Sequence, residues 1–241
     1  QAPLIIGLGE GEFMCASDTP AIANFTNIIL PMEDEEIALL TPLGVEIYDS
    51  NNERQYRNPI SLNISEQIVD KMNFKHYMLK EIYDQPETAK NWLEKYLIKN
   101  SNNGQLEINF PFDTNFFESI ERIEIIACGT SKHAAMVGSF LLEQFAGIPT
   151  NVFYASEFRY SPPPLLPNIL TIGVTQSGET ADTIAAINME ITRRSLVEDE
   201  NFKPNLIAIT NRTDSSIGRQ ISNIIDIGAG IEIGVAATKT F

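Results

Sequence analysis

The chain has 241 residues, of which 43% are hydrophobic and 20% charged, and its 17 basic and 32 acidic side chains give a formal net charge of −15. This composition excludes global disorder, because it supplies enough apolar surface for one large or two modest domains. The acidic excess argues against a nucleic-acid partner or an anionic membrane, and no apolar run approaches the roughly 20 residues that span a bilayer. We therefore expect a soluble protein of the cytoplasm or an organelle stroma.

The two cysteines, Cys15 and Cys128, lie far apart in the sequence. They form neither a disulfide framework nor a cluster of metal ligands, which fits a reducing compartment. Because a free cysteine is usually a small packing residue, we predict that Cys15 is buried and is not a nucleophile. We expect no metal ion and no cofactor.

The first 58 residues favour antiparallel β structure. Short apolar runs bounded by turn residues predict four strands, at Leu4–Gly7, Asn27–Pro31, Glu36–Leu40 and Gly44–Tyr48. The Ser, Asp and Pro residues within Ala16–Pro20 indicate the start of a helix. The loop Leu8–Glu12 is too acidic to hold a phosphate, because its carboxylates would repel an anion.

Residues 59–118 are predicted to form a helical connector. The run Lys75–Tyr83 has helical spacing and is predicted to end before Pro86, which suits the first turn of a second helix. In that second helix Trp92 recurs with other apolar residues at helical spacing, so it is predicted to be a packing residue. We expect the same role for His76.

Residues 119–241 alternate between buried strands and helices. Strands are expected near residues 123–127, 150–154, 169–174, 205–210 and 223–227. Helices are expected after Ser131, Thr180 and Ser215. This alternation predicts an α/β fold with a doubly wound parallel sheet.

Two turns rich in hydroxyl groups follow neighbouring strands of this predicted sheet. Cys128–Ser131 comes after the strand near 123–127, and Thr175–Thr180 comes after the strand near 169–174. Each turn opens a helix, whose unpaired N–H groups and positive dipole end suit a phosphate, and Gly178 would let the backbone approach the ligand. A capped turn without a ligand, with Ser177 as the N-cap, is the structural alternative. Since the carboxyl ends of parallel strands share one edge, we expect the two turns to converge there.

Four motifs carry a resemblance to a known family. They are, in chain order, CGTS (128–131), ASEFRY (155–160), QSGETADT (176–183) and EIGVAATK (232–239). Together they resemble the sugar isomerase (SIS) domain of the glutamine:fructose-6-phosphate aminotransferase family. The motif QSGET alone is shared by many SIS domains, whereas all four in this order are more specific.

The resemblance also implies a domain organisation. Residues 1–58 resemble the β-rich C-terminal end of the family's N-terminal-nucleophile glutaminase domain, and residues 59–118, with KHYMLKEIYDQP, resemble its interdomain linker. Residues 119–241 then correspond to most of the first SIS domain. On this view the chain is an internal fragment of a longer enzyme, because the family's nucleophilic cysteine matches no residue here and its catalytic glutamate, histidine and lysine lie in a second SIS domain.

The activity implied by the resemblance is the first step of the hexosamine pathway. The family converts fructose 6-phosphate and glutamine into glucosamine 6-phosphate and glutamate, works without a cofactor and forms homodimers or larger homo-oligomers. By resemblance this chain supplies the substrate-binding residues and no catalytic residue. The residues expected to hold fructose 6-phosphate are Cys128, Gly129, Thr130, Ser131, Thr175, Gln176, Ser177, Thr180 and Val235.

Several alternatives stay open. A non-catalytic SIS module that senses or regulates through a phosphosugar would explain the missing catalytic groups. A ketose-aldose phosphosugar isomerase would share the SIS fold but has no reason to carry the glutaminase-like front end. A nucleotide-binding domain is disfavoured, because neither turn has the glycine spacing of a dinucleotide loop. Glu157 and Arg159 could form an ion pair or contribute to a dimer contact.

Overall fold

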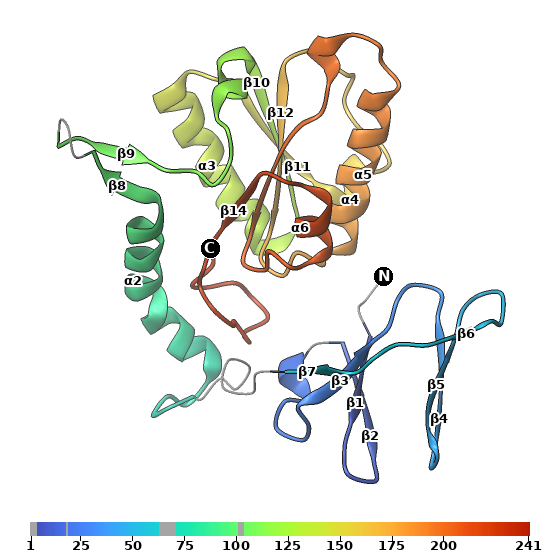
Figure 1. The fold of residues 1–241 in the computed structure, drawn as a ribbon. Helices are drawn as coiled ribbons and strands as arrows, with labels where there is room; N and C mark the ends of the chain where they lie inside the picture. Colours follow the sequence, from blue (N-terminus) through green and yellow to red (C-terminus); the bar gives the residue numbers. More distant parts are fainter. Residues whose placement is uncertain (1–3, 18, 63–70, 101–103) are drawn as a thin grey trace. The chain divides into compact units, whose positions relative to one another are not determined.

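The computed structural model describes residues 4–17, 19–62, 71–100 and 104–241 (Figure 1). The chain forms two compact units, Gln1–Met72 and Asn73–Phe241. The boundary between the units falls inside the predicted connector of residues 59–118, and the three-part domain division stays a prediction. No helix in the described ranges is both long and apolar enough to cross a lipid bilayer.

The first unit consists of antiparallel strands, as its sequence pattern predicts. One sheet has the order β2-β1-β3-β7 and is formed by β1 (Ile5–Leu8), β2 (Phe13–Ala16), β3 (Ile28–Pro31) and β7 (Ile60–Ser61). A second sheet is formed by β4 (Ile37–Thr41), β5 (Gly44–Tyr48) and β6 (Arg54–Gln55). Ile5, Ile22 and Ile29 form a small core.

Two predictions for this unit are wrong in detail. Cys15 is exposed, and it lies on β2, which is an edge strand among the described strands of its sheet. The expected helix at Ala16–Pro20 is only a short 3-10 helix, η1 (Thr19–Ala21). Hydrogen-bonded turns over residues 22–26 follow it before β3 begins at Ile28.

The second unit begins with one long helix and not with two short ones. Helix α2 (Tyr77–Tyr96) runs without a break through Pro86. The predicted break is wrong because tertiary contacts on both sides of Pro86 hold the helix, although a proline in a helix interior costs about 3 kcal/mol. Glu81 lies before Pro86 and Tyr96 lies after it, and both are buried. The hairpin β8 (Leu97–Lys99) and β9 (Leu106–Ile108) and the 3-10 helix η2 (Asn115–Ser119) follow.

A five-stranded parallel sheet forms the centre of the second unit, at the positions that the sequence predicts. Its strand order is β11-β10-β12-β13-β14. The strands are β10 (Arg122–Ala127), β11 (Thr150–Tyr154), β12 (Ile169–Thr175), β13 (Asn205–Thr210) and β14 (Ile224–Asp226). All four pairings are parallel.

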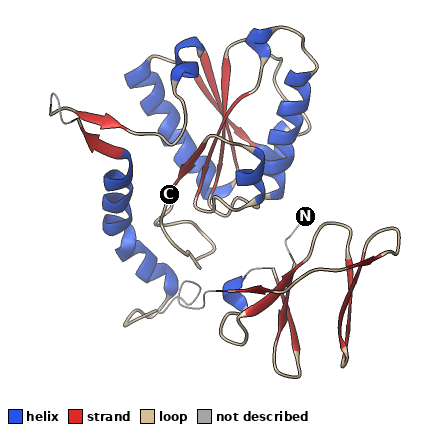
Figure 2. Ribbon diagram, in the orientation of Figure 1, coloured by secondary structure: helices blue, strands red, loops and turns tan. Residues whose placement is uncertain are grey.

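Helices cover both faces of this sheet, so the predicted doubly wound fold is confirmed (Figure 2). Because side chains alternate along a strand, Ile125 faces helix α3 (Gly129–Ala146) and packs in one core with Ala135. Its neighbour Ile126 faces the other side and packs in a second core with Ile187. That side is covered by α4 (Ala155–Phe158), α5 (Ala181–Ser195) and α6 (Ser216–Gln220), and the 3-10 helix η3 (Glu200–Phe202) precedes β13.

Candidate functional site

The two predicted turns meet at one cavity of about 440 Å³, at the carboxyl ends of the adjacent strands β10 and β12. A third segment, residues 232–237, completes its wall. The residues that line the cavity are Cys128, Gly129, Thr130, Ser131, Gln176, Ser177, Thr180, Glu232, Gly234, Val235, Ala236 and Ala237. Eight of the nine predicted substrate-binding residues are therefore brought together, and Thr175 is the exception.

The first turn presents an open helix N-terminus to the cavity. Cys128 has an extended backbone and is the N-cap residue of α3, and its side chain makes no capping hydrogen bond. Gly129 follows with φ +54, in the left-handed region that favours glycine. The N–H groups in the first turn of a helix have no acceptor within that helix. The cavity wall at 129–131 is therefore a set of backbone donors at the positive end of α3, flanked by the hydroxyls of Thr130 and Ser131.

The second turn is a local hydroxyl-stabilised loop and not a helix capped by Ser177. The Ser177 hydroxyl accepts a hydrogen bond from the Glu179 N–H at 3.1 Å. Helix α5 begins at Ala181, with Thr180 as its N-cap residue. The Ser177-capped alternative is thus wrong, because the chain makes one more turn at Gly178, with φ +69, before the helix starts.

Thr175 lies behind the cavity wall and does not line it. The residue is only 2% exposed. Its Oγ1 lies 3.0 Å from the Thr180 Oγ1 and accepts a hydrogen bond from the Gly178 N–H at 3.3 Å. In this structure the Thr175 hydroxyl fixes the turn that carries Ser177 and Thr180.

Gly178 makes its close approach to a neighbouring loop and not to the cavity. A Cβ at this position would lie 1.9 Å from the Ser215 Oγ. Backbone hydrogen bonds join the turn to this loop, from the Asn211 N–H to the Gln176 carbonyl at 3.1 Å, and to α6, from the Ile217 N–H to the Gly178 carbonyl at 3.2 Å. The second turn is therefore held in place by the loop that follows β13.

The third wall carries Val235, whose side chain is fully exposed at the rim. Glu232 braces this wall from within, because its Oε1 accepts hydrogen bonds from the Thr238 N–H at 2.8 Å and the Lys239 N–H at 3.0 Å. Its Oε2 accepts a hydrogen bond from the Thr240 hydroxyl. Glu81 of α2 holds the same segment from outside. The sequence motifs did not identify Glu81, because nothing in its neighbourhood distinguishes it from other helical glutamates.

The cavity offers hydrogen-bond donors without a basic side chain. Among the described residues that line it, none is Lys or Arg. Its donors are backbone N–H groups, hydroxyls and the amide of Gln176. An anion with several acceptor oxygens fits such a site better than an extended apolar ligand.

Arg159, in the motif between the two turns, forms an ion pair with Asp182 and not the pair with Glu157 that the sequence suggests. Its Nη1 lies 2.7 Å from the Asp182 Oδ1, in the first turn of α5, and not against Glu157. This hydrogen bond to Asp182 is the main cause that raises the pKa of the arginine. The segment 155–160 is thereby tied to the start of the helix that follows the second turn.

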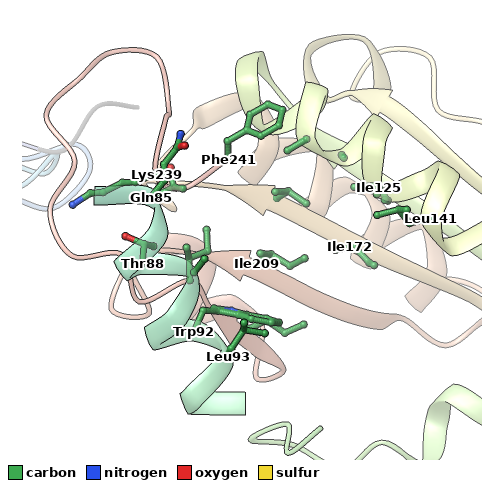
Figure 3. A pocket seen from close by; sticks show the side chains of 18 of the residues that line it. Gln85, Thr88, Trp92, Leu93, Ile125, Leu141, Ile172, Ile209, Lys239 and Phe241 are labelled. Atoms are coloured by element: carbon green, nitrogen blue, oxygen red, sulfur yellow. The ribbon is translucent and has the colours of Figure 1, made fainter. Parts of the chain in front are cut away.

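A larger cavity of about 880 Å³ lies between α2, α3 and the sheet (Figure 3). Its wall is mostly aliphatic and aromatic and includes Trp92, which is half-buried and whose ring centroid lies 5.0 Å from that of Tyr96. Figure 3 shows Trp92 and Leu93 of α2 on one side and Ile172 and Ile209 of the sheet on another. Few polar groups converge here, so the smaller cavity is the better candidate for a functional site.

Comparison with known proteins places this cavity in a segment shared with a known family. A model of the SIS domain family matches residues 116–241, which include both turns and the third wall. The glutamine--fructose-6-phosphate aminotransferase (isomerizing) of Thermosynechococcus vestitus is 56% identical over 245 residues, covering 100% of this chain and 39% of that protein. The protein of the same name from Aquifex aeolicus is 43% identical over 240 residues, covering 100% of this chain and 37% of that protein.

A solved structure is similar as well. The C-terminal domain of glucosamine-fructose-6-phosphate aminotransferase from Francisella tularensis superposes with a TM-score of 0.63 at 35% identity, covering 72% of this chain and 45% of that one. The chain spans about two fifths of the length of the curated relatives named above, which are covered to 39% and 37%.

Proposed function

Because the chain belongs to the SIS domain family, we propose that it is part of a glutamine:fructose-6-phosphate aminotransferase, which makes glucosamine 6-phosphate and glutamate. In that enzyme the cavity at the ends of β10 and β12 binds fructose 6-phosphate. The observation that carries this proposal is the convergence of two helix-opening turns, with the hydroxyls of Thr130, Ser131, Ser177 and Thr180, on one cavity.

The donor groups of the cavity suit a phosphate group, and the acidic side chain in its lining, Glu232, is already hydrogen-bonded to residues 238–240. The N-terminus of each helix acts as roughly half a positive charge, and two such ends face the cavity. Backbone N–H groups and hydroxyls can supply a donor to each phosphate oxygen without a lysine or arginine. This matters in a chain of net charge −15, because a local set of donors must outweigh an unfavourable overall field.

The residues of this chain bind and orient the sugar in the proposed reaction. The enzyme opens the ring of fructose 6-phosphate, adds ammonia released from glutamine and moves a proton between C1 and C2. The chain has two histidines, His76 and His133, and neither is among the residues that line the cavity. The acid–base groups are therefore expected from another part of the longer protein, and Cys128 serves as a small wall residue.

The aminotransferase is favoured over a phosphosugar sensor or a simple phosphosugar isomerase. The relative from Thermosynechococcus vestitus matches the entire chain, including the β-rich first unit, which an isomerase or sensor built on the SIS fold alone would not need. We also propose a cytoplasmic homodimer or larger homo-oligomer. An exposed apolar face on α3, with Val137, Phe140 and Phe145, supports such an assembly.

The proposal is tested by ligand-dependent thermal stability of the chain. Fructose 6-phosphate should raise the melting temperature, because a ligand that binds the folded state stabilises it, and fructose should not. The substitution Ser131→Ala removes a cavity hydroxyl and should weaken this stabilisation by fructose 6-phosphate. Ser139→Ala, on the same helix but bonded to the Met136 carbonyl, is the matched control. Equal stabilisation by both sugars, or by neither, would argue against a phosphate site here.

A further inference from the structure

We propose that Glu81, on helix α2, is a positioning residue that fixes the third wall of the cavity, residues 232–237. Glu81 does not line the cavity itself. The inference rests on the proposed function for the identity of the ligand, but the contact between Glu81 and the wall stands independently of it.

The contact is a buried carboxylate that accepts hydrogen bonds from consecutive backbone N–H groups. The Glu81 Oε1 lies 2.6 Å from the Ile233 nitrogen and 3.1 Å from the Gly234 nitrogen, and its Oε2 lies 3.2 Å from the Gly234 nitrogen. Glu81 is only 2% exposed, so these hydrogen bonds are shielded from water. A charged acceptor makes stronger hydrogen bonds than a neutral one, and more so away from solvent.

Gly234 has no side chain, and the Glu81 carboxylate occupies the space that a side chain would need. A Cβ at Gly234 would lie 2.5 Å from the Glu81 Oε2, closer than a side chain can come. The residue is not among those with a positive φ, so its backbone does not by itself require glycine. The need for glycine here therefore comes from the approach of Glu81.

Helix α2 holds the same segment at a second point beyond the cavity. The Gln85 Nε2 donates a hydrogen bond to the Thr238 carbonyl at 2.9 Å, and the Asp84 carboxylate lies 3.9 Å from the Lys239 Nζ. One turn of α2 therefore bonds the chain on both sides of the cavity residues Val235–Ala237: Glu81 before them and Gln85 after them. Of the two, Glu81 is the buried one and is adjacent to the wall.

Two substitutions separate the effect of the Glu81 charge on the third wall from the effect of its side-chain length. Glu81→Gln keeps the shape but replaces one acceptor oxygen with an NH2 group, which donates and does not accept, so a donor would face the Gly234 N–H. Glu81→Asp keeps the charge but shortens the reach. Glu87→Gln, at an exposed position on the same helix, is the matched control.

The test measures two quantities on the 241-residue chain, the amide hydrogen exchange of residues 233 and 234 and the dissociation constant for fructose 6-phosphate. Glu81→Gln should speed exchange at these two amides, leave exchange in α3 unchanged and weaken binding about tenfold, the effect of losing a charge-assisted hydrogen bond. Glu81→Asp should restore part of the affinity, and Glu87→Gln should match the unsubstituted chain.

Gly234→Ala disturbs the contact with Glu81 by a change in the wall itself. It tests the proposal if the Glu81→Gln variant does not fold. It should reproduce the faster exchange and weaker binding, and the double variant should be no worse than either single one. Unchanged exchange at residues 233 and 234, or unchanged affinity, in the folded variants would overturn the proposal. If the unsubstituted chain does not bind fructose 6-phosphate, the proposed function fails, whereas the exchange measurement still tests the contact.

Discussion

Gly178 is the residue on which the geometry of the second turn depends most. It combines a left-handed backbone, φ +69, with a Cβ position 1.9 Å from the Ser215 Oγ. The first feature disfavours any side chain, and the second leaves no space for one. Both arise from the packing of the QSGET turn against the loop after β13.

We predict that Gly178→Ala destabilises the chain by about 2 to 6 kcal/mol, the sum of a strained backbone and an overpacked contact. It should also abolish stabilisation by fructose 6-phosphate, because Ser177 and Thr180 move with the turn. Denaturant unfolding and ligand titration measure the two effects.

Gly138→Ala is the control for this substitution. Gly138 lies in α3, and a Cβ there meets no atom within 4 Å. Alanine at this helical position should be neutral or stabilise the chain by up to about 1 kcal/mol. Similar destabilisation by both substitutions would contradict the steric argument.

At the scale of elements, the interface between α5 and the sheet contains charged groups as well as apolar ones. Glu190 and Arg194 of α5 are both buried and form an ion pair of 2.6 Å. Glu124 of β10 faces them and is only 3% exposed. Burial, and next the charge of Glu190, raise the pKa of Glu124 to about 6 from 4.5, while the charges of Arg194, Arg193 and Arg122 act in the opposite direction.

The raised pKa of Glu124 predicts how stability depends on pH. Between pH 4.5 and 6 the folded chain holds this proton more tightly than the unfolded chain, so the contribution of Glu124 to the free energy of unfolding falls as the pH rises. Glu124→Gln removes the ionisation. The stability of this variant relative to the unsubstituted chain should therefore rise by about 1.5 kcal/mol between pH 4.5 and pH 7.5.

Chemical denaturation at both pH values measures this difference. Glu118→Gln, at an exposed position in η2, should show no such change and serves as the control. A Glu124→Gln variant whose stability relative to the unsubstituted chain stays constant across this range would mean that Glu124 has an ordinary pKa in the folded chain.

The elements themselves differ in how well the sequence predicts them. The five strands of the parallel sheet have continuous apolar runs bounded by turns, which are local signals, and all five form where expected. Helix α2 was predicted as two helices, because the effect of Pro86 is local and the contacts that override it are not. Tyr96, for example, bonds the backbone of Asp226 through its hydroxyl, at a separation of 130 positions.

In the candidate site, too, features that depend on local sequence are predicted and features that depend on distant contacts are not. The residues of the two turns were found because each turn carries its own motif. The position of Thr175 behind the wall was missed, because it depends on how the turn folds back on Thr180. Glu81 was missed because its partner Ile233 lies 152 positions away, and the pattern of one sequence holds no signal for such a pair.

At the scale of the whole molecule, the site lies within one unit. All residues that line the candidate cavity, and Glu81, belong to Asn73–Phe241. Both large apolar cores belong to this unit as well. The first unit contributes none of the groups proposed to hold the phosphate.

We therefore predict that residues 73–241, produced without the first unit, fold and bind fructose 6-phosphate within about threefold of the affinity of the 241-residue chain, a difference below about 0.7 kcal/mol. Calorimetric titration of both proteins measures this. Residues 1–72 alone should not bind the sugar and serve as the control. A much weaker affinity of the shorter protein would mean that the first unit supports the site.

The order of the three walls along the chain also sets when the site becomes complete during synthesis. A ribosome produces the first turn at residues 128–131, then the second at 176–180, which needs the loop after β13 to hold it, and only later the third at 232–237. On the proposed function, fructose 6-phosphate would therefore find no finished cavity on a nascent chain that ends before residue 237. The proposed ligand would then stabilise only molecules in which all three walls have formed.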